Sequence, residues 1–518
     1  MSAPIGDVDA RRGAFRGARA LVVGLGLTGE AAARTLAALG ADVVAIDTRP
    51  DVAARAAASL TGVLVLEPEP TAGGPHGDPQ DEAADRSRAA SALVERALAL
   101  DPRLAVVSPG IPPASPLIAL PRAAGLDVMS EFDLAWLVRA DDAPWLFVTG
   151  TNGKTTTAQM TSALLRAGGL HAPPLGNMGV AVSTVALEGI ADDAGVVRPP
   201  EAWPIEIAAL QLYDTHRAEP TASICLNVAE DHLDHFGSMA AYRAAKASVY
   251  SRVRLACVYP TWEDGARAMV EEAGVLEGAR AVGLTLGVPG PSEIGVVEDL
   301  VVDRAFHPRR WTEALALFTP DDLAHLGGAA GVPPHVLTNA MAAAALARAG
   351  GTPAEAVAPG LRGFRLDAHR SAVVAQADEI TWINDSKATN AHAAAAALRA
   401  IPAGTVVWLA GGDAKGADLE ELIAQYAPAM RAVVLLGVDR SPWLGPLRRH
   451  APHLPVFEVP EGDDGEVMRV AVRAARDHAR PGDTVLLAPA GASWDQFRNY
   501  GHRGDAFAAA VRDLLGTA

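Results

Sequence analysis

The segment PWLFVTGTNGKTTTAQM, residues 144–160, constrains the fold more than any other part of the chain. An apolar stretch typical of a buried strand leads into a glycine-rich turn that ends at Lys154, and a helical pattern follows. Such a turn presents backbone N–H groups and an ammonium group to phosphates, and the Thr155 hydroxyl can reach magnesium. A strict phosphate-loop pattern has glycine five residues before Gly153, where this chain has Val148. The segment predicts nucleotide binding within an α/β domain, and the alternative is a lysine-bearing turn without that role.

A second glycine-rich turn, GLGLTG at 24–29, lies near the start of the chain. It also stands between a strand-like and a helical segment, and Asp47 ends the next strand-like segment. Glycines at this spacing bring backbone N–H groups and a helix N-terminus close to a diphosphate. The ligand could be NAD or another diphosphate nucleotide such as a UDP-sugar, and a purely structural turn is the alternative. Arg49, directly after Asp47 and Thr48, favours a phosphate-bearing ligand, because the ribose of NAD requires an unneutralised carboxylate.

Strand-like apolar segments alternate with helical patterns along most of the chain. In the last third, the expected strands are 379–385, 405–412, 432–438 and 483–490. This alternation predicts the α/β class, with mainly parallel sheets covered by helices. We expect three domains: a Rossmann-like domain at 1–140, a P-loop ATPase-like domain at 141–366 and a second Rossmann-like domain at 367–518. The segment 67–90, rich in Gly, Pro, Asp and Ala, is expected to be an exposed and partly disordered insertion.

The net charge and the number of cysteines exclude some classes of partner and of protein. The formal net charge is -17, and nucleic-acid binding requires basic surfaces, so we expect no nucleic-acid partner. Cys225 and Cys257 are too few for a disulfide framework and are expected to be reduced and structural. No signal peptide is predicted, and no run of about twenty apolar residues suggests a membrane span. We expect a monomeric cytoplasmic protein.

The order of further motifs identifies a family. TGTNGKTTT resembles the ATP loop of the Mur ligase family, which also includes folylpolyglutamate synthetases. The motifs that continue the resemblance are EIAALQL (206–212), LNVAEDHLDHFGS (226–238), YRAAKASVY (242–250), HVLTNAMAA (335–343), HR (369–370), WINDSKATN (382–390), GGDAKGAD (411–418) and LAPAGASWDQFRNYGHRGDAF (487–507). The resemblance spans nearly the whole chain, and its last three motifs are typical of the D-glutamate-adding members of the family.

The resemblance implies an ATP-dependent amide-bond ligase of peptidoglycan precursor synthesis. Its substrates would be UDP-N-acetylmuramoyl-L-alanine, bound by the first domain, and D-glutamate, bound by the third. The substrate carboxylate would take the γ-phosphate of ATP, and the amine of D-glutamate would then displace phosphate from the acyl phosphate. Because two anions must meet in the first step, positive charge is needed between them. ATP and Mg²⁺ are the implied cofactors, with two ions and a carbamate on the lysine at 246.

The family resemblance also assigns roles residue by residue. The implied catalytic residues are Lys154, Glu206, His232, Lys246 and Lys387. The implied nucleotide-binding residues are Gly150, Thr151, Asn152, Gly153, Lys154, Thr155, Thr156, Asn339, Arg370 and Asp385. The implied substrate-binding residues are Leu27, Thr28, Thr48, Arg49 and Asn177 for the UDP substrate, and Thr389, Lys415, Ser493 and Tyr500 in the D-glutamate region. The implied metal-binding residues are Thr155, Glu206, His232 and Lys246.

Some positions depart from the family pattern. Two serines of the usual E-L-S-S-F-Q-L motif are Ala208 and Ala209, an asparagine of H-N-x-x-N is Val336, and the cysteine of P-A-C-A-S is Gly491. Tyr500 stands where phenylalanine is common in the family. Tyrosine adds a hydroxyl but keeps the aromatic ring, which can still pack. Three alternatives remain open at this point: a dehydrogenase that uses GLGLTG, another Mur ligase or folylpolyglutamate synthetase, and an inactive nucleotide-binding scaffold.

Overall fold

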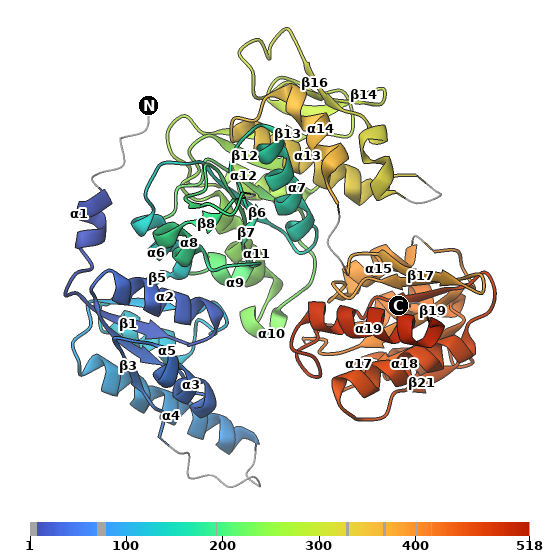
Figure 1. Cartoon of the computed structure of the whole chain (residues 1–518), viewed down its shortest axis with the longest axis horizontal. Helices are drawn as coiled ribbons and strands as arrows, with labels where there is room; N and C mark the ends of the chain where they lie inside the picture. Colours follow the sequence, from blue (N-terminus) through green and yellow to red (C-terminus); the bar gives the residue numbers. More distant parts are fainter. Residues whose placement is uncertain are drawn as a thin grey trace. The chain divides into compact units, whose positions relative to one another are not determined.

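In the computed structural model of the chain, the described residues form four β-sheets with helices packed around them (Figure 1). The structure describes residues 8–69, 79–192, 194–327, 331–365, 369–399, 401–415 and 417–516. Two compact units are formed, the first by Met1–Val228 with Ala240–Phe364 and the second by Ala229–Met239 with Arg365–Ala518. Within the described ranges, none of the helices is both long and apolar enough for a membrane span.

The first sheet of the first unit has five parallel strands in the order β3-β2-β1-β4-β5. The strands are β1 (Arg19–Val23), β2 (Asp42–Ile46), β3 (Val63–Leu66), β4 (Leu104–Val107) and β5 (Asp127–Ser130). The strand order reverses between β1 and β4, which is where sheets of this kind bind nucleotides at their carboxyl edge. The turn at 24–29 leaves β1 at this reversal.

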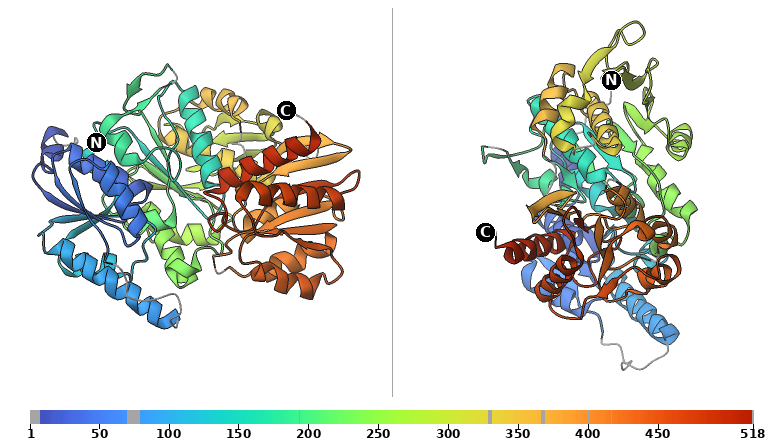
Figure 2. Two further views of the ribbon diagram at one scale, coloured as in Figure 1. Left: turned by 60° about the horizontal axis from the view of Figure 1, so that its bottom comes forward. Right: turned by 90° about the vertical axis from the view of Figure 1, so that its right-hand side faces the viewer.

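Both faces of this sheet are covered because its side chains alternate between two cores. Val22 of β1 packs in the core that includes Leu36 of α2 (Leu27–Ala38). Leu21 packs on the other face, with Leu93 of α4 (Pro79–Leu98). The light-blue α4 and the dark-blue α2 lie on opposite sides of the strands in Figures 1 and 2. Helices α3 (Pro50–Ser59) and α5 (Pro116–Ala123) complete the layers.

The expectation of a disordered insertion at 67–90 is wrong for its last part, because α4 begins at Pro79. Ala90, Leu93, Val94 and Ala97 are buried at helical spacing and anchor the helix to the sheet. The first turns carry the Asp- and Ala-rich composition that suggested disorder, whereas the apolar face lies further along the helix. Residues 70–78 fall outside the described part of the chain.

The second sheet of the first unit has nine strands in the order β16-β15-β14-β13-β12-β11-β6-β10-β7. The strands are β6 (Trp145–Thr149), β7 (Leu175–Gly176), β10 (Trp203–Glu206), β11 (Ala222–Cys225), β12 (Ala256–Pro260), β13 (Arg280–Leu284), β14 (Glu293–Val297), β15 (Leu300–Asp303) and β16 (Leu315–Phe318). Pairing is parallel from β7 to β14, and β15 and β16 add an antiparallel extension. A separate small sheet pairs β8 (Ile190–Ala191) with β9 (Val197–Arg198).

Strand β6 lies inside this sheet, between β11 and β10, and all five of its residues are buried. The helix that follows it, α7 (Lys154–Ala167), packs on α13 (Pro334–Ala349) and α14 (Val357–Gly363). Trp145 stacks on Trp203 at a centroid distance of 5.3 Å. The loop that β6 presents is therefore supported by a rigid, close-packed strand and helix.

The second unit contains a six-stranded sheet in the order β17-β18-β22-β19-β20-β21. The strands are β17 (Ala372–Ala377), β18 (Ile380–Asn384), β19 (Val406–Gly411), β20 (Ala432–Leu436), β21 (Val456–Glu458) and β22 (Thr484–Leu487). All pairs are parallel except β17 with β18. The four strands expected in the last third of the sequence are confirmed.

Helices cover both faces of this third sheet. In β19, Val407 packs with Phe507 on one face, and Trp408 packs with Leu447 on the other. The first face carries α18 (Asp464–His478) and α19 (Tyr500–Leu515), which lie side by side in Figures 1 and 2. The second face carries α15 (Ala391–Arg399), α16 (Glu420–Tyr426) and α17 (Ser441–His450). The predicted α/β class is confirmed, whereas the domain boundaries at 140 and 366 stay a prediction.

Candidate active site

The loop between β6 and α7 has the geometry of a phosphate-binding turn. Gly150 and Gly153 adopt φ values of 149° and 82°, which favour glycine. Asn227 holds the loop from the neighbouring strand end: its Oδ1 accepts from the Asn152 N–H at 2.9 Å, and its carbonyl accepts from the Thr151 N–H at 3.0 Å. Two strand ends are thus tied together around one concave turn.

Lys154 lies folded over this turn. Its Nζ donates to the carbonyl oxygens of Gly150 at 2.9 Å and Thr151 at 2.8 Å. Thr155 and Thr156 follow in the first turn of α7 and are each 3% exposed. The ammonium group, the helix N-terminus and a hydroxyl therefore gather at one place, which is the arrangement expected for polyphosphate and magnesium.

Asn339 on α13 is brought against the same loop. A Cβ at Gly153 would lie 2.7 Å from its Oδ1, so the amide is packed directly on the glycine. Asn339 is 8% exposed, and its neighbour one turn earlier, Val336, is 3% exposed and part of the core. The structure therefore brings Asn339, an expected nucleotide-binding residue, against the loop 150–156, and Val336 serves packing.

Glu206 ends β10 beside the loop, because it pairs in register with Val148 of β6. Its Oε1 accepts from Asn177 Nδ2 at 3.3 Å, so the structure brings these two expected residues together. Its Oε2 is buried and finds no hydrogen-bond partner among the described residues. A Cβ at Gly176 would lie 2.0 Å from the Glu206 carbonyl oxygen, so only glycine allows β7 this close. A buried carboxylate oxygen without a donor suits a cation.

Lys246 lies on α11 (Met239–Ala247) and is 1% exposed. Its Nζ is 4.7 Å from the centroid of the Tyr242 ring, one turn earlier on the same helix. The Tyr242 hydroxyl is 3.3 Å from Thr151 Oγ1, which links this helix to the loop. Lys246 is thus a buried amine in the neighbourhood of the phosphate-binding turn.

His232 and its neighbour Asp231 belong to the second unit. His232 adopts a left-handed φ of 54°, and its Nε2 is 3.7 Å from Asp231 Oδ2. Asp231 Oδ1 in turn accepts from Lys415 Nζ at 2.7 Å. Lys415, expected to bind a carboxylate of D-glutamate, therefore pairs with a carboxylate of the protein.

The expected metal residues are divided between the two units: Thr155, Glu206 and Lys246 lie in the first and His232 in the second. Over the described ranges no group of three or more His, Cys, Asp or Glu has metal-binding spacing. The expected set contains only one carboxylate and one imidazole, so it is not a cluster of that kind.

In the second unit, the turn after β18 carries Asp385, Lys387 and Thr389. Burial raises the pKa of Asp385 to about 6, although the Arg370 guanidinium and hydrogen bonds from Ser371 oppose this. The Arg370 Nε is buried and has no hydrogen-bond partner among the described residues. Asp385 and Arg370 are therefore brought together at the carboxyl edge of the sheet.

Lys387 and Tyr500 also meet. The Lys387 Nζ lies 4.9 Å from the centroid of the Tyr500 ring, so the ring keeps the packing role expected where phenylalanine is common. Ser493, on the loop after β22, is 2% exposed. The Ala490 N–H donates to the Ala388 carbonyl at 2.9 Å, which ties that loop to the turn after β18.

The sequence analysis did not single out two polar residues of this unit, Asn384 and Arg503. Asn384 Nδ2 lies 2.9 Å from His369 Nδ1 and donates to the Gly504 carbonyl at 2.9 Å. Arg503, 1% exposed, donates from Nη2 to the carbonyls of Ser386 at 2.9 Å and Gly491 at 3.1 Å. Burial lowers the pKa of Arg503 to about 9. Asn384 lies in the motif WINDSKATN and Arg503 in LAPAGASWDQFRNYGHRGDAF, and a polar side chain within a family motif is the feature that could have identified each of them.

The first sheet places its expected residues at the carboxyl edge of β1 and β2. Asp47 accepts from the Leu25 N–H at 2.7 Å and from Arg49 Nε and Nη2 at 2.9 and 2.8 Å. Burial disfavours the charge on Asp47, but these donors outweigh it and hold its pKa below the usual value. The carboxylate is thus neutralised, which argues against an NAD ribose here. Leu27 is 75% exposed, and Thr48 is exposed beside Arg49.

Thr28 borders a cavity of about 10 Å³, roughly the volume of one water. Its other walls include Glu131 and Phe132 of α6 (Glu131–Val138) and Gln211 of α9 (Ala209–Leu212). This cavity therefore joins the first sheet to the segment that carries the serine-to-alanine departures. There Gln211 Oε1 accepts from the Ala208 N–H at 2.8 Å, so a side chain from the next turn satisfies that N–H.

The departure at Gly491 also has a structural reason. A Cβ there would lie 3.0 Å from the Trp443 ring and 3.0 Å from the Gly411 carbonyl oxygen. Trp443 is 0% exposed and fills the space next to the loop. A cysteine side chain at this position would require that ring to move.

Three parts of the chain match known protein families. The sequence pattern "Mur ligase middle domain" matches residues 148–347, and "Mur ligase, glutamate ligase domain" matches 369–491. The pattern "Alanine dehydrogenase/PNT, C-terminal domain" matches 10–96. The last match agrees with the Rossmann-like strand order of the first sheet.

Several proteins similar over nearly the full length share one name. UDP-N-acetylmuramoylalanine–D-glutamate ligase of Leifsonia xyli is 43% identical over 97% of this chain and 94% of its own. The proteins of the same name from Streptomyces avermitilis and Mycobacterium bovis are 44% and 40% identical and cover 96% of this chain, and 99% and 96% of their own lengths.

Solved structures share the fold at low identity. A pseudomurein peptide ligase type C from Methanothermus fervidus has a TM-score of 0.53 at 16% identity, covering 96% of this chain and 100% of its own. UDP-N-acetylmuramate-alanine ligase from Thermotoga maritima has a TM-score of 0.50 at 16% identity, covering 97% and 100%.

Proposed function

The chain belongs to the Mur ligase family, among its UDP-N-acetylmuramoylalanine–D-glutamate ligases, and we propose how its residues perform that reaction. The enzyme uses ATP and Mg²⁺ to join D-glutamate to UDP-N-acetylmuramoyl-L-alanine in peptidoglycan precursor synthesis. The observation that carries the account is the loop 150–156, with Lys154 over it and the unpartnered Glu206 oxygen beside it.

In the first step, a carboxylate oxygen of the muramoyl substrate attacks the γ-phosphorus of ATP, and the bond to the β–γ bridging oxygen breaks. ADP leaves and an acyl phosphate remains. Lys154 is placed to move from the carbonyls of its own loop to the phosphates, where its charge lowers the repulsion between two anions. The α7 N-terminus and Asn339 bind the nucleotide on either side of Gly153.

Glu206, His232 and Thr155 would hold Mg²⁺, which when bound supplies positive charge between the carboxylate and the phosphate. The donor set fits a hard cation, because carboxylate and hydroxyl oxygens are ligands that magnesium prefers. The buried Glu206 Oε2, which has no protein donor among the described residues, is the strongest support. We propose two ions, with Asn177 holding the other Glu206 oxygen in place.

Lys246 carries a carbamate in this proposal. A carbamate on its Nζ would turn a buried cation into an anion able to support magnesium, and the lysine lies near the loop through Tyr242 and Thr151. Incubation with ¹³C-labelled bicarbonate should give a protein-bound carbamate resonance in wild type that is absent in Lys246→Arg. An unchanged spectrum in the variant would rule out carbamylation at this residue.

In the second step, the D-glutamate amine attacks the acyl carbon and phosphate leaves with the carboxylate oxygen. Thr389, Lys415 and Ser493 bind the acceptor carboxylates in this proposal, with Lys387 and Tyr500 next to them. Lys415 already accommodates a carboxylate, that of Asp231, so the acceptor would replace Asp231 as its partner. Hydroxyl donors and one cation match a dicarboxylate.

Nucleotide contacts of the second unit come from Arg370 and Asp385, whose closeness supports a shared role at the phosphates and ribose. On the first sheet, Leu27, Thr28, Thr48 and Arg49 bind the uridine and diphosphate, and the Asp47–Arg49 pair sets the position of that guanidinium. We assign these roles to domains at 1–140, 141–366 and 367–518. We further propose a monomeric cytoplasmic enzyme without a nucleic-acid partner.

The test is phosphate release from ATP with UDP-N-acetylmuramoyl-L-alanine and one acceptor at a time: D-glutamate, L-glutamate, L-alanine or meso-diaminopimelate. Release that requires D-glutamate is expected. Release with a different acceptor would place the chain elsewhere in the family, and none with any acceptor would support an inactive scaffold.

A further inference from the structure

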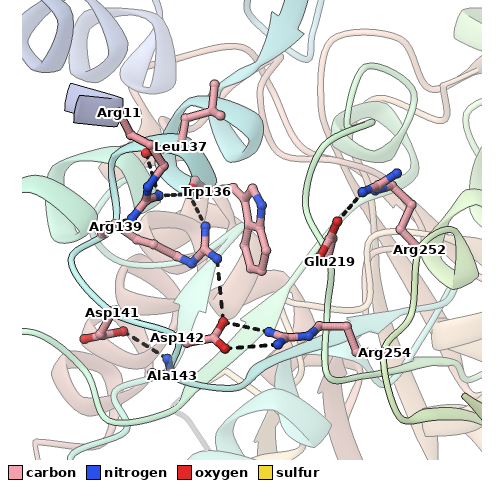
Figure 3. Close-up of polar contacts among 10 residues, drawn as sticks. All are labelled: Arg11, Trp136, Leu137, Arg139, Asp141, Asp142, Ala143, Glu219, Arg252 and Arg254. Atoms are coloured by element: carbon pink, nitrogen blue, oxygen red, sulfur yellow. Dashed lines mark hydrogen bonds and ion pairs between the residues drawn. The ribbon is translucent and has the colours of Figure 1, made fainter. Parts of the chain in front are cut away.

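Arg11 and Arg12 of the N-terminal helix α1 (Val8–Gly13) reach the end of helix α6, and Figure 3 shows the contacts of Arg11. Arg11 Nη1 donates to the Leu137 carbonyl at 2.8 Å and lies 3.5 Å from that of Trp136, and its Nη2 donates to the Arg139 carbonyl at 3.0 Å. Arg12 Nε donates to the Val138 carbonyl at 2.7 Å. These contacts join parts of the chain more than 120 residues apart.

The last carbonyls of an α-helix have no partner within the helix, and its C-terminus is negative. At the end of α6 and its C-cap, the four consecutive carbonyls from residue 136 to residue 139 each receive an arginine donor: Arg139 itself for Trp136, Arg11 for Leu137 and Arg139, and Arg12 for Val138. Three cations thus meet one helix end, and we name this set the arginine clamp: Arg11, Arg12 and Arg139.

Arg139 is the buried member of the arginine clamp. It is 4% exposed, and its guanidinium carbon lies 3.2 Å from the centroid of the Trp136 ring. Its pKa is lowered to about 10, mainly by burial and then by the charge of Arg11, while Asp142 acts in the opposite direction. Such crowding of like charge is tolerated only where acceptors balance it, which the helix end and Asp142 do.

The clamp acts on a helix that connects two regions of the proposed site. At its N-terminal end, Glu131 and Phe132 wall the cavity next to Thr28. At its C-terminal end, the chain turns through residues 139–144 and enters β6, the strand that presents the Lys154 loop. A shift of α6 would therefore move the first sheet relative to the phosphate-binding turn.

Three further contacts fix the surroundings of α6. Arg12 Nη2 donates to the Ala186 carbonyl of α8 (Val182–Glu188) at 3.0 Å. Asp142, in the turn before β6, accepts from Arg254 Nη1 and Nη2 at 2.7 and 3.0 Å, and Arg139 Nη2 lies 3.7 Å from it (Figure 3). The joint between the first sheet and β6 is thus held from three neighbouring segments.

We propose that Arg11 and Arg12 are positioning residues for the ligation: by holding α6, they fix the UDP-substrate region at the correct distance from the Lys154 loop. They touch no substrate themselves, and the inference rests on the substrate regions proposed above. The competing explanation is that α1 is only an anchor for the N-terminal segment.

The test compares Arg11→Gln/Arg12→Gln with a matched double variant, Arg34→Gln/Arg55→Gln. The control removes two exposed arginines of the same unit that lie 3.5 and 3.7 Å from Glu30. The readouts are kcat and KM for each substrate, the Kd of ATP without the other substrates, and hydrogen exchange of the peptide covering 136–144.

The clamp variant should lose about tenfold or more in kcat/KM for the UDP substrate, because small displacements of bound groups are costly to catalysis. The Kd of ATP should stay within about twofold, since the loop itself is intact, and amides at 136–144 should exchange faster. Arg11→Lys/Arg12→Lys, which keeps the charges but not the forked donors, should recover part of the loss.

If the clamp variant had unchanged kcat/KM but faster hydrogen exchange at 136–144, α1 would be only an anchor and the proposal would be overturned. Unchanged hydrogen exchange at 136–144 would also overturn it, because α6 would then not depend on the clamp. A loss equal to that of the control would also overturn it. Failure of the proposed function itself would be visible separately, as wild-type enzyme that releases no phosphate with the UDP substrate and D-glutamate.

Discussion

Glu206→Gln separates a functional carboxylate from a structural one, because the two roles predict opposite changes in stability. The buried Oε2 of Glu206 has no donor among the described residues, and Oε1 has one, Asn177 Nδ2 at 3.3 Å. Leaving a buried polar group without a partner costs about 1–3 kcal/mol, and more when it is charged. Glutamine keeps the acceptor for Asn177 and removes the charge.

The ligand-free variant should therefore be more stable than wild type by about 1 kcal/mol or more, which corresponds to a rise of roughly 1 °C or more in Tm for a unit of this size. Its kcat should fall by about 100-fold or more, because charge placed at the reacting groups is lost. Thermal unfolding without ligands and the phosphate-release assay measure the two effects, and Mg²⁺ with ADP should stabilise the variant less than wild type.

Glu201→Gln is the matched control, since Glu201 Oε2 accepts from the His171 N–H at 2.7 Å and lies 3.1 Å from Arg198. It should lose a little stability and keep full activity. If Glu206→Gln were destabilised by 1 kcal/mol or kept kcat within about tenfold, the carboxylate would be structural and the metal role wrong.

Other substitutions test the remaining parts of the site. Gly504→Ala should destabilise the protein by about 1–3 kcal/mol in chemical denaturation, because the new Cβ would lie 2.2 Å from His369 Nδ1. In the control Gly445→Ala, the new Cβ would lie 3.6 Å from its nearest neighbour, and stability should not change. Equal effects of the two substitutions would contradict the packing argument. The pKa of Asp385 is raised to about 6, so ionisation of this carboxyl destabilises the folded state. Wild type should therefore lose stability relative to Asp385→Asn as the pH rises from about 4 through 6. Parallel curves of stability against pH for the two proteins would contradict the burial of this charge. Asn339→Ala should raise KM for ATP by about tenfold and leave KM for the UDP substrate unchanged, which steady-state kinetics will decide.

The sequence predicted features that depend on short segments. Lys154 and its glycines, the turn at 24–29 and the four strands of the third sheet each combine local composition with a characteristic spacing. The Asp47–Arg49 pair was also predictable, because the two residues are only two positions apart in the loop after one strand. These features define the α/β class and the position of the phosphate-binding turn.

Other features depend on contacts between distant segments. Arg503 meets Ser386 across 117 residues, and Arg11 meets Leu137 across 126, so no local pattern distinguishes these arginines from exposed ones. Helix α4 was missed because its apolar face begins only after a polar first half. The glycine at 491 is explained by Trp443, which no motif contains.

The central claim is that the substrate carboxylate is activated by taking phosphate from ATP. The most direct measurement uses UDP-N-acetylmuramoyl-L-alanine with ¹⁸O in both oxygens of its terminal carboxylate, together with D-glutamate, ATP and Mg²⁺. Mass spectrometry of the released phosphate should find one ¹⁸O in each molecule, because the oxygen that attacks phosphorus leaves with it. Unlabelled phosphate, released while the amide product forms, would contradict the acyl phosphate route and the role given to the Lys154 loop.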